Sequence, residues 1–504
     1  MPGDETTRDR ARWIAGFAAG LLAALAGAGV GHLVAALLNP AASPVLAVGD
    51  QVIDLTPTPV KVWAVRELGS ADKPILIGSV LAVTLILAGV AGVIARRRFG
   101  AGLVLLLVLV GLAGAAAVLQ PAAGPLDILP AAATAVVGAA MLAFLTRAAS
   151  TARGGGGRRA FLLASAGTAL LAAAAGGAGQ WIVRAKDSVA DLVLPRPAEP
   201  LPAQPTGLEG RYDVTPLVTP NEDFYRVDIN LTVPVVDVEG WTLTIDGDVE
   251  QEVSLTFEEL AGMEVVERDI TMTCVSNEVG GNLLGGARWL GVPLSAVLER
   301  AGIDGTGADQ VLSTSDDGFT LSTPLDVALD RTLVVFGMNG EPLPREHGFP
   351  VRLVTPGVYG YVGSTKWLTR LTLTTFEEEA AYWTERQWAE TAPIKLSSRI
   401  DTPKGLEPVD AGETVIAGVA WAQPHGVAKV EVRIDGGEWQ QARLGPEVNA
   451  SYWRQWYLPW EAESGNHDVA VRATDSRGEV QTDERATPFP SGSSGIQQIV
   501  VRVA

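Results

Sequence analysis

Residues 271–277, Thr-Met-Thr-Cys-Val-Ser-Asn, contain Cys274, the single cysteine in a chain of 504 residues. One cysteine cannot form an intramolecular disulfide, and it cannot supply a Cys-x-x-Cys motif for zinc or covalent haem. It can supply one soft thiolate ligand to a metal whose other ligands come from elsewhere. Because an isolated cysteine is more often a small buried hydrophobic residue, the interpretation of Cys274 depends on the sequence around it.

The two parts of the chain differ in composition. Ala, Leu, Val and Gly dominate the first part, whereas most acidic residues follow residue 200. The length predicts several domains, because single cores stop growing near about 250–300 residues. A net charge of −19 argues against a nucleic-acid partner, since phosphate binding requires a basic surface. We therefore expect an apolar N-terminal region followed by soluble domains.

Five apolar stretches in the first part are long enough for membrane-spanning helices. A helix needs about 20 residues to cross a hydrocarbon core of about 30 Å. The stretches carry no Asp, Glu, Lys or Arg and comprise residues 13–38, 75–95, 102–119, 128–146 and 160–183. This pattern favours a multi-pass membrane region over the buried helices of a soluble protein.

The arginines between these stretches predict their orientation. They lie before the first span, between the second and third, and between the fourth and fifth: Arg8, Arg10, Arg12, Arg96, Arg97, Arg98, Arg147, Arg153, Arg158 and Arg159. The alternate loops, 39–74 and 120–127, are poor in Lys and Arg. The positive-inside rule therefore places the N-terminus in the cytoplasm and everything after Val183 outside.

The start of the fifth span has a second interpretation. Arg158-Arg159-Ala160-Phe161-Leu162 and the apolar run after it resemble a twin-arginine export signal, which addresses folded, cofactor-loaded proteins for export. Two further arginines that obey the positive-inside rule explain the same residues. Both interpretations stay open.

After a Pro-rich linker, the pattern changes to short strands and helices. Residues 241–247 alternate and turn like a strand entering a hairpin. Residues 257–260 and 293–298 indicate short amphipathic helices, and residues 351–354 indicate a buried strand. This mixture predicts an α+β domain.

The motifs of this domain resemble those of the sulfite oxidase superfamily, the molybdenum–molybdopterin enzymes. From residue 221 onwards they follow the order of that family: 221–225, 241–247, 273–277, 288–294, 339–344, 347–352 and 359–367. The resemblance implies a Mo-molybdopterin cofactor, with Cys274 as the protein ligand of the metal. We further expect Asn277, three residues after the cysteine, to be catalytic by orienting the substrate or an oxo ligand. It implies these cofactor-binding residues: Asn221, Phe224, Tyr225, His347, Arg352, Gly363, Ser364, Thr365 and Lys366.

The last hundred residues alternate like the strands of a β-sandwich, with turns at regular spacing. They are similar to the immunoglobulin-like dimerisation domain of the same superfamily, which implies a homodimer. The predicted order is a cytoplasmic N-terminus at 1–12, a membrane region with five transmembrane helices at 13–183, a linker at 184–206, a molybdopterin-binding domain at 207–385, a connector at 386–404 and the immunoglobulin-like domain at 405–504.

Two departures from the family bear on substrate and electron partner. Sulfite-oxidising members carry arginines after the cysteine motif, because a sulfur oxyanion needs a cationic pocket. Here Glu278-Val279-Gly280-Gly281 follow, which disfavours sulfite and, for the same reason, nitrate. In the spans, His32 is the only histidine, so the helices cannot hold bis-histidine haem. We expect a separate electron carrier, such as a quinone or a membrane cytochrome.

The sequence therefore predicts a membrane-anchored, extracytoplasmic oxidoreductase that transfers an oxygen atom to or from a small substrate, with sulfur compounds as candidates. The alternative is a non-catalytic surface protein that uses a degenerate oxidoreductase domain and the immunoglobulin-like domain for binding. The presence of all four predicted cofactor residues favours the enzyme, because a domain without a cofactor would not require them: Cys274, His347, Arg352 and Lys366.

Overall fold

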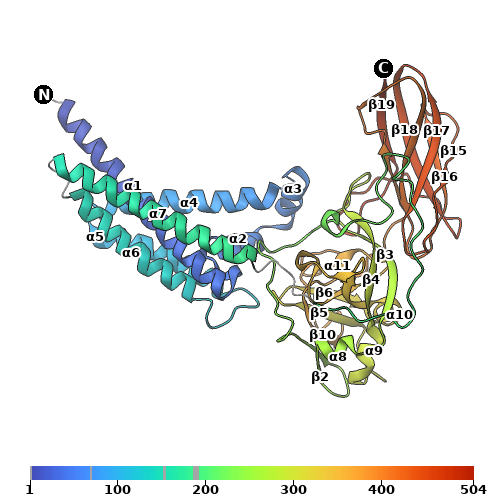
Figure 1. The fold of residues 1–504 in the computed structure, drawn as a ribbon, viewed down its shortest axis with the longest axis horizontal. Coiled ribbons are helices and arrows are strands. Elements are labelled where there is room, and N and C mark those ends of the chain that lie inside the picture. Colours follow the sequence, from blue (N-terminus) through green and yellow to red (C-terminus); the bar gives the residue numbers. More distant parts are fainter. Residues whose placement is uncertain (1–2, 69–70, 151–154, 186–191) are drawn as a thin grey trace. The chain divides into compact units, whose positions relative to one another are not determined.

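The computed structural model describes residues 3–68, 71–150, 155–185 and 192–504 (Figure 1). The chain divides into two compact units. The first contains residues 1–188 together with 228–235, and the second contains residues 189–227 together with 236–504. Arg153 lies outside the described residues, as do the side chains of Arg8, Arg10 and Arg158.

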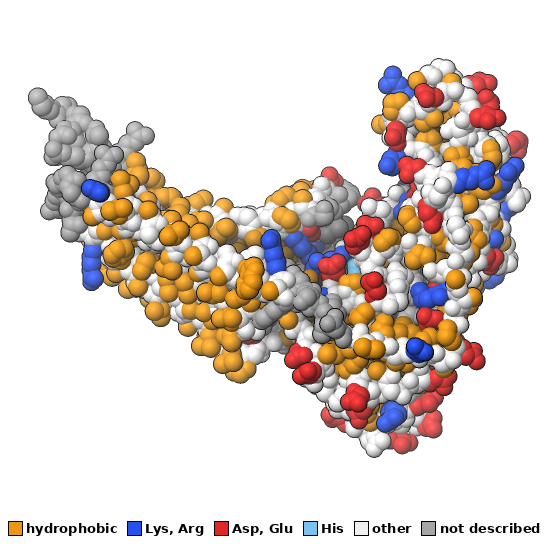
Figure 2. Space-filling model, in the orientation of Figure 1, with side chains coloured by type: hydrophobic (Ala, Val, Ile, Leu, Met, Phe, Trp, Pro, Cys, Tyr) orange, Lys and Arg blue, Asp and Glu red, His pale blue; other side chains and the backbone are white. Residues whose placement is uncertain are grey.

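The first unit is helical. In the described part of the chain, five helices are long and apolar enough to span a membrane, judged by length and composition. They coincide with the five predicted spans and are α1 (Gly3–Leu37), α4 (Asp72–Ala95), α5 (Phe99–Val118), α6 (Leu129–Ser150) and α7 (Gly155–Ala185). Large apolar side chains cover the face of these helices shown in Figure 2, as expected of helices that contact lipid.

Small residues let the helices approach closely. Helix α1 packs against α4, α6 and α7. A methyl group added at Gly20 of α1 would overlap the carbonyl oxygen of Ala88 in α4, and one at Gly92 would overlap the carbonyl oxygen of Gly16. Glycine at such contacts is typical of helix packing in membranes, because it brings the two backbones together.

The segment between the first two spans also contains helices. Helix α2 (Pro44–Leu55) begins with a proline at its first position, where the missing N–H costs nothing. It is followed by α3 (Thr58–Leu68). Asp50 of α2 is buried and accepts hydrogen bonds from the backbone N–H of Leu231 (2.9 Å) and from the Gln120 amide (3.3 Å). Residues 228–235 are therefore held by the helical unit, although they lie far along the chain.

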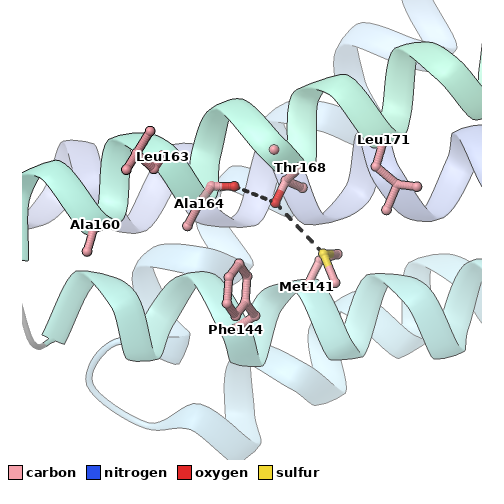
Figure 3. A pocket seen from close by; sticks show the side chains of 8 residues that line it. Met141, Phe144, Ala160, Leu163, Ala164, Thr168 and Leu171 are labelled. Carbon is pink, nitrogen blue, oxygen red and sulfur yellow. Dashed lines mark hydrogen bonds between the residues drawn. The ribbon is translucent and has the colours of Figure 1, made fainter.

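An apolar groove runs between α6 and α7 (Figure 3). It has a volume of about 390 Å³, and its eight lining residues include Phe144 and Leu171. The hydroxyl of Thr168 lies in it, where it donates to the Ala164 carbonyl oxygen (2.9 Å) and contacts the Met141 sulfur (3.8 Å). The hydroxyl is therefore satisfied within the helices.

The second unit begins with an α+β domain, which confirms the predicted class. One sheet has the order β2-β1-β10-β5-β6 and the other β3-β4-β7-β8, with β9 paired to β7. The strands are β1 (Thr242–Gly247), β2 (Val253–Thr256), β3 (Val266–Thr273), β4 (Leu284–Pro293), β5 (Gln310–Ser315), β6 (Thr320–Pro324), β7 (Leu333–Met338), β8 (Glu341–Pro342), β9 (Arg352–Val354) and β10 (Leu368–Thr374).

Four short helices complete this domain: α8 (Phe257–Ala261), α9 (Leu294–Leu298), α10 (Leu325–Arg331) and α11 (Gly360–Gly363). Thr256 and Glu259 form a capping box at the start of α8, which satisfies backbone N–H groups that the first helical turn leaves unpaired. The helix and strand predictions at 241–247, 257–260, 293–298 and 351–354 are all confirmed.

The C-terminal part consists of two sheets around one core. Their orders are β11-β13-β17-β16 and β12-β19-β18-β14-β15. The strands are β11 (Ser397–Thr402), β12 (Pro408–Val409), β13 (Gly412–Trp421), β14 (Val427–Ile434), β15 (Gln440–Gln441), β16 (Arg443–Leu444), β17 (Arg454–Ala462), β18 (Gly465–Asp475) and β19 (Gln497–Val503). Both sheets contribute to this core, for example Trp456 from the first and Val471 from the second.

Candidate functional site

Cys274 lies directly after the last residue of strand β3. Its backbone N–H donates to the Leu283 oxygen (2.9 Å), and its own carbonyl oxygen accepts from the N–H of Asn277 (3.0 Å). These bonds fold residues 274–277 into a turn, which we call the Cys274 turn. The cysteine is buried, with 9% of its surface exposed. A strand end followed by a hydrogen-bonded turn gives this side chain a fixed position.

Asn277 holds the turn rather than presenting a free amide. It is 4% exposed, and its side-chain oxygen accepts from the N–H of Leu283 (2.9 Å). The neighbouring Glu278 has an exposed side chain. The turn therefore buries the amide next to the cysteine and directs the carboxylate of Glu278 to solvent.

Two buried tyrosines lie within electrostatic reach of Cys274. Burial raises the pKa of Cys274, while hydrogen bonds from the Ser276 backbone and hydroxyl oppose that rise. Burial raises the pKa of Tyr359 to about 12, and a negative charge on Cys274 raises it further. Burial also raises the pKa of Tyr225, to which a charged Cys274 again adds. Both phenols therefore stay protonated at neutral pH and can donate hydrogen bonds beside the thiol.

The structure brings the predicted pterin segment and His347 together. The segment begins with the 3₁₀-helix Asn221–Asp223. The His347 ring nitrogen Nε2 lies 3.0 Å from the Asn221 carbonyl oxygen. Phe224 stacks on Tyr225 at 5.3 Å between ring centroids and meets the His347 ring edge-on at 5.6 Å. Four residues predicted from two separate motifs, 221–225 and 347–352, thus form one cluster.

Arg352 joins this cluster to the loop before β10. It is 4% exposed, and its guanidinium donates to the carbonyl oxygens of His347 (2.9 Å) and Ser364 (3.3 Å). It also lies over the Trp289 ring, 5.3 Å from the centroid. A buried arginine held by carbonyl oxygens and an aromatic face keeps its charge where an anionic ligand can use it.

Residues 363–366 play different parts in this loop. Gly363 packs so closely that an added methyl group would overlap the Thr355 hydroxyl. The Thr365 hydroxyl is buried and lies 2.6 Å from the Ser313 hydroxyl, so it forms a hydrogen bond inside the domain and does not face a ligand. Lys366 is half-buried and donates to the Glu346 oxygen (3.1 Å). The loop therefore offers backbone groups, Ser364 and the Lys366 ammonium to a phosphate.

These residues fit a molybdopterin that is bound through Cys274. Among the described residues, no three His, Cys, Asp or Glu side chains lie close enough together to hold a metal ion. A metal at Cys274 thus needs ligands that the protein does not supply, such as the sulfurs of a pterin. The neighbouring Thr273 hydroxyl is buried and has no hydrogen-bond partner in the described part of the chain, which leaves a polar group for a ligand to satisfy.

The C-terminal sheets contribute to the site, which the sequence analysis missed. The Ser493 hydroxyl donates to the backbone oxygen of Asn277 (2.5 Å). Arg399 of β11 is 7% exposed and donates to the backbone oxygen of Gly281 (2.9 Å) while it pairs with Asp401 (2.6 Å). No local signal marks these residues, because an arginine in a strand and a serine in a loop are common.

Comparisons with known proteins agree with this geometry. Residues 230–383 match the family described as the oxidoreductase molybdopterin binding domain. The chain is 31% identical to mitochondrial sulfite oxidase of Homo sapiens over 320 residues, which covers 53% of this chain and 57% of the human protein. It is 30% identical to sulfite oxidase of Gallus gallus, of which it covers 69%, with 53% of this chain.

A nitrate reductase [NAD(P)H] of Hordeum vulgare is 30% identical, with 48% of this chain and 34% of that protein covered. The chain spans little more than half the length of the mammalian sulfite oxidases that it matches. In fold, it is similar to the sulfane dehydrogenase SoxCD from Paracoccus pantotrophus, with a TM-score of 0.51, 23% identity, and 56% of this chain and 81% of that chain covered. Together with the Cys274 cluster, these matches show that the chain belongs to the sulfite oxidase superfamily of molybdopterin-dependent oxidoreductases.

Proposed function

We propose that this protein is a membrane-anchored, extracytoplasmic oxidoreductase that transfers an oxygen atom to or from a small substrate. The names of its relatives make oxyanions of sulfur and nitrogen, and related sulfur compounds, the first substrates to test. A bound molybdenum–molybdopterin would supply the two-electron oxygen-atom transfer. Because the relatives are matched over part of their length, the substrate and the electron partner are proposals.

The observation that carries this proposal is the position of Cys274. It is a buried thiol on a hydrogen-bonded turn, near two protonated tyrosines and the Thr273 hydroxyl, which has no partner among the residues that the structure describes. Cys274 would donate its thiolate to the metal, because a bound cation deprotonates a coordinating thiol. His347, Arg352, Ser364 and Lys366 would hold the pterin and its phosphate. Asn277 would act through the shape of the Cys274 turn.

Metal analysis of the detergent-extracted protein tests this proposal. We expect one molybdenum per chain in the native protein and none in Cys274→Ser. A second variant, Cys274→Ser with Ser276→Cys, keeps one thiol but moves it by two residues, and it should also lack molybdenum. Metal bound equally by the relocated thiol would contradict a role for Cys274. A metal-free native protein would favour the non-catalytic surface protein instead.

The contacts at one end of the helical unit support the proposed orientation. Arg96, which follows α4, donates to the backbone oxygens of Arg12 in α1 (3.1 Å) and Ala149 in α6 (3.4 Å). The arginine-rich ends of three helices therefore meet. Asp127 lies just before the opposite end of α6 and accepts a hydrogen bond from the Asn39 amide (3.0 Å). The loops at that end, 39–74 and 120–127, are poor in Lys and Arg. The arginine-rich end would face the cytoplasm.

Single new cysteines in the Cys274→Ser background test this orientation. Ala123→Cys and Ser150→Cys mark the two ends of the bundle. With an impermeant maleimide on spheroplasts, we expect labelling at residue 123 and none at residue 150 until the cells are opened. The reverse pattern would overturn the orientation. Replacing Arg158 and Arg159 with lysine, which keeps the positive charge, would block export only if they form a twin-arginine signal.

The electron partner and the dimer are tested separately. His32 lies 3.0 Å from the Ser43 hydroxyl and is the only histidine in the spans. We propose that electrons pass to or from a separate quinone or membrane cytochrome, which assays with each carrier would distinguish. The C-terminal sheets would form an immunoglobulin-like domain that joins two copies, and the mass of the detergent-solubilised protein tests whether it dimerises.

A further inference from the structure

Lys395 lies in the segment that leads into the C-terminal sheets. Its backbone N–H donates a hydrogen bond to the Tyr359 hydroxyl oxygen (3.4 Å). The residue before it, Ile394, donates its N–H to the Gly357 oxygen (3.0 Å). Backbone pairing therefore fixes Lys395 beside the tyrosine that feels the charge of Cys274.

The loop around Gly492 connects this lysine with the Cys274 turn. The Lys395 ammonium donates a hydrogen bond to the Gly492 carbonyl oxygen. A methyl group added at Gly492 would lie 2.5 Å from the Tyr359 hydroxyl oxygen, so the tyrosine packs directly on this glycine. The next residue, Ser493, donates to the backbone oxygen of Asn277. Lys395, Tyr359 and the Cys274 turn thus meet at residues 492 and 493.

The surroundings of Lys395 leave its charge available. The side chain is half-buried, and burial lowers its pKa because the charged form loses hydration. Within the described ranges of the chain, Lys395 forms no ion pair with a carboxylate. An ammonium has three N–H donors, and Gly492 accepts one of them. An ammonium that donates to a neutral carbonyl oxygen would form a stronger hydrogen bond with a negatively charged oxygen.

We propose that Lys395 is the specificity-determining residue of the site and holds a negatively charged oxygen of a small oxyanion substrate. The flexible four-carbon stem of lysine lets the ammonium shift from the Gly492 oxygen toward such a group. The proposal rests on the proposed function, because it places the substrate beside Cys274. It also supplies the cationic group that the residues after Cys274 lack, from a segment about 120 residues further along the chain.

Kinetics of the full-length holoenzyme test this role. Lys395→Met should raise the KM for sulfite or nitrate about tenfold, the effect of losing one charge-assisted hydrogen bond. It should leave the KM for a neutral sulfoxide and the molybdenum content unchanged. Lys395→Arg should restore part of the anion affinity, and Lys404→Met, which removes an exposed lysine, should behave as the native protein does. An unchanged oxyanion KM, or an equal loss with the sulfoxide, would overturn the proposal.

A binding measurement separates this proposal from the proposed function. At low millimolar concentration, and relative to sodium chloride of equal ionic strength, sulfate should raise the melting temperature of the native protein and of Lys404→Met, and it should have no such effect on Lys395→Met. This result would support the anion site even if the native protein turned over neither substrate, in which case the proposed reaction alone would fail. Equal stabilisation of all three proteins by sulfate would refute a role for Lys395.

Discussion

The Ser493 hydroxyl donates a hydrogen bond to the backbone oxygen of Asn277, 2.5 Å away. Ser493 belongs to the C-terminal sheets' last loop, and Asn277 is three residues after Cys274. The turn that presents the cysteine is therefore held from outside its own domain. A ligand that must keep a fixed direction depends on such support as much as on its own strand.

Ser493→Ala should lower activity severalfold while the molybdenum content stays constant, because the turn loses a hydrogen bond worth about 1 kcal/mol. Steady-state kinetics with metal analysis measures both quantities. Ser494→Ala is the matched control, since its hydroxyl bonds to the Glu484 oxygen (2.8 Å) in an exposed place. Equal effects of the two substitutions would contradict a specific role for Ser493.

Arg399→Met should lower the melting temperature by several degrees, because it leaves the mostly buried Asp401 carboxylate without its positively charged partner. The two side chains are 8% and 10% exposed, and breaking such a pair costs about 3–5 kcal/mol. Arg370→Met removes an arginine whose side chain is 52% exposed and whose partner Asp246 is 19% exposed, and it should cost at most about 1 kcal/mol. Thermal unfolding of the two variants side by side would show the difference, and similar melting temperatures would refute it.

Gly348→Ala should reduce cofactor content. Gly348 has a φ of +109°, and an added methyl group would lie 3.0 Å from side-chain atoms of both Arg352 and Lys366. Gly340→Ala imposes a similar backbone cost at a φ of +83°, with open space around the new methyl group. The pterin content of both variants distinguishes two causes: displacement of Arg352 and Lys366, which only Gly348→Ala produces, and backbone strain, which both produce. Loss of pterin from both would point to strain alone.

Gly20→Leu should destabilise the helical unit, because the larger side chain overlaps the Ala88 carbonyl oxygen and forces α1 away from α4. Gly78→Leu, at a glycine of α4 with open space around it, should be tolerated. The fraction of protein that stays monodisperse in detergent after heating measures the effect. Tolerance of leucine at both positions would contradict the close packing of α1 on α4.

The ion pair between His467 and Asp435 should make stability depend on pH. Its hydrogen bond to Asp435 raises the pKa of His467, and the same bond lowers the pKa of Asp435. The contribution of His467 to the free energy of unfolding is fully present below its unfolded pKa of about 6.5, and it is lost as the pH rises through the raised pKa of the folded state. The carboxyl contribution is present above its unfolded pKa of about 3.9 and is lost as the pH falls through the lowered value.

The native protein should therefore exceed His467→Gln in stability at pH 5.5 and lose that advantage by pH 8.5. The difference should stay below about 1 kcal/mol, since the side chains are 15% and 50% exposed. Melting temperatures at the two pH values measure it, with His425→Gln as the control. An advantage that grows with pH would have the wrong sign.

The sequence predicted much of the fold because the relevant signals are local. Five long apolar stretches become five helices, since length and hydropathy alone determine whether a segment suits a membrane. The alternation at 241–247 becomes strand β1, since alternate residues of a strand face opposite sides. The helices α2 and α3 were not predicted, because they are short and flanked by an apolar span on each side.

The ordered motifs identify the family, and they single out Cys274, His347 and Arg352 as the predicted cofactor residues, because these residue types lie in short patterns that can be read locally. The tertiary structure decided which groups support and surround the cysteine. Ser493 bonds to Asn277 in the Cys274 turn, and Arg399 bonds to Gly281 just after it, each from more than 100 residues away. Lys395 bonds to Gly492, the residue before Ser493. Each makes its contact through a backbone oxygen, a group that every residue carries, so no sequence pattern reveals the pairing before the chain has folded.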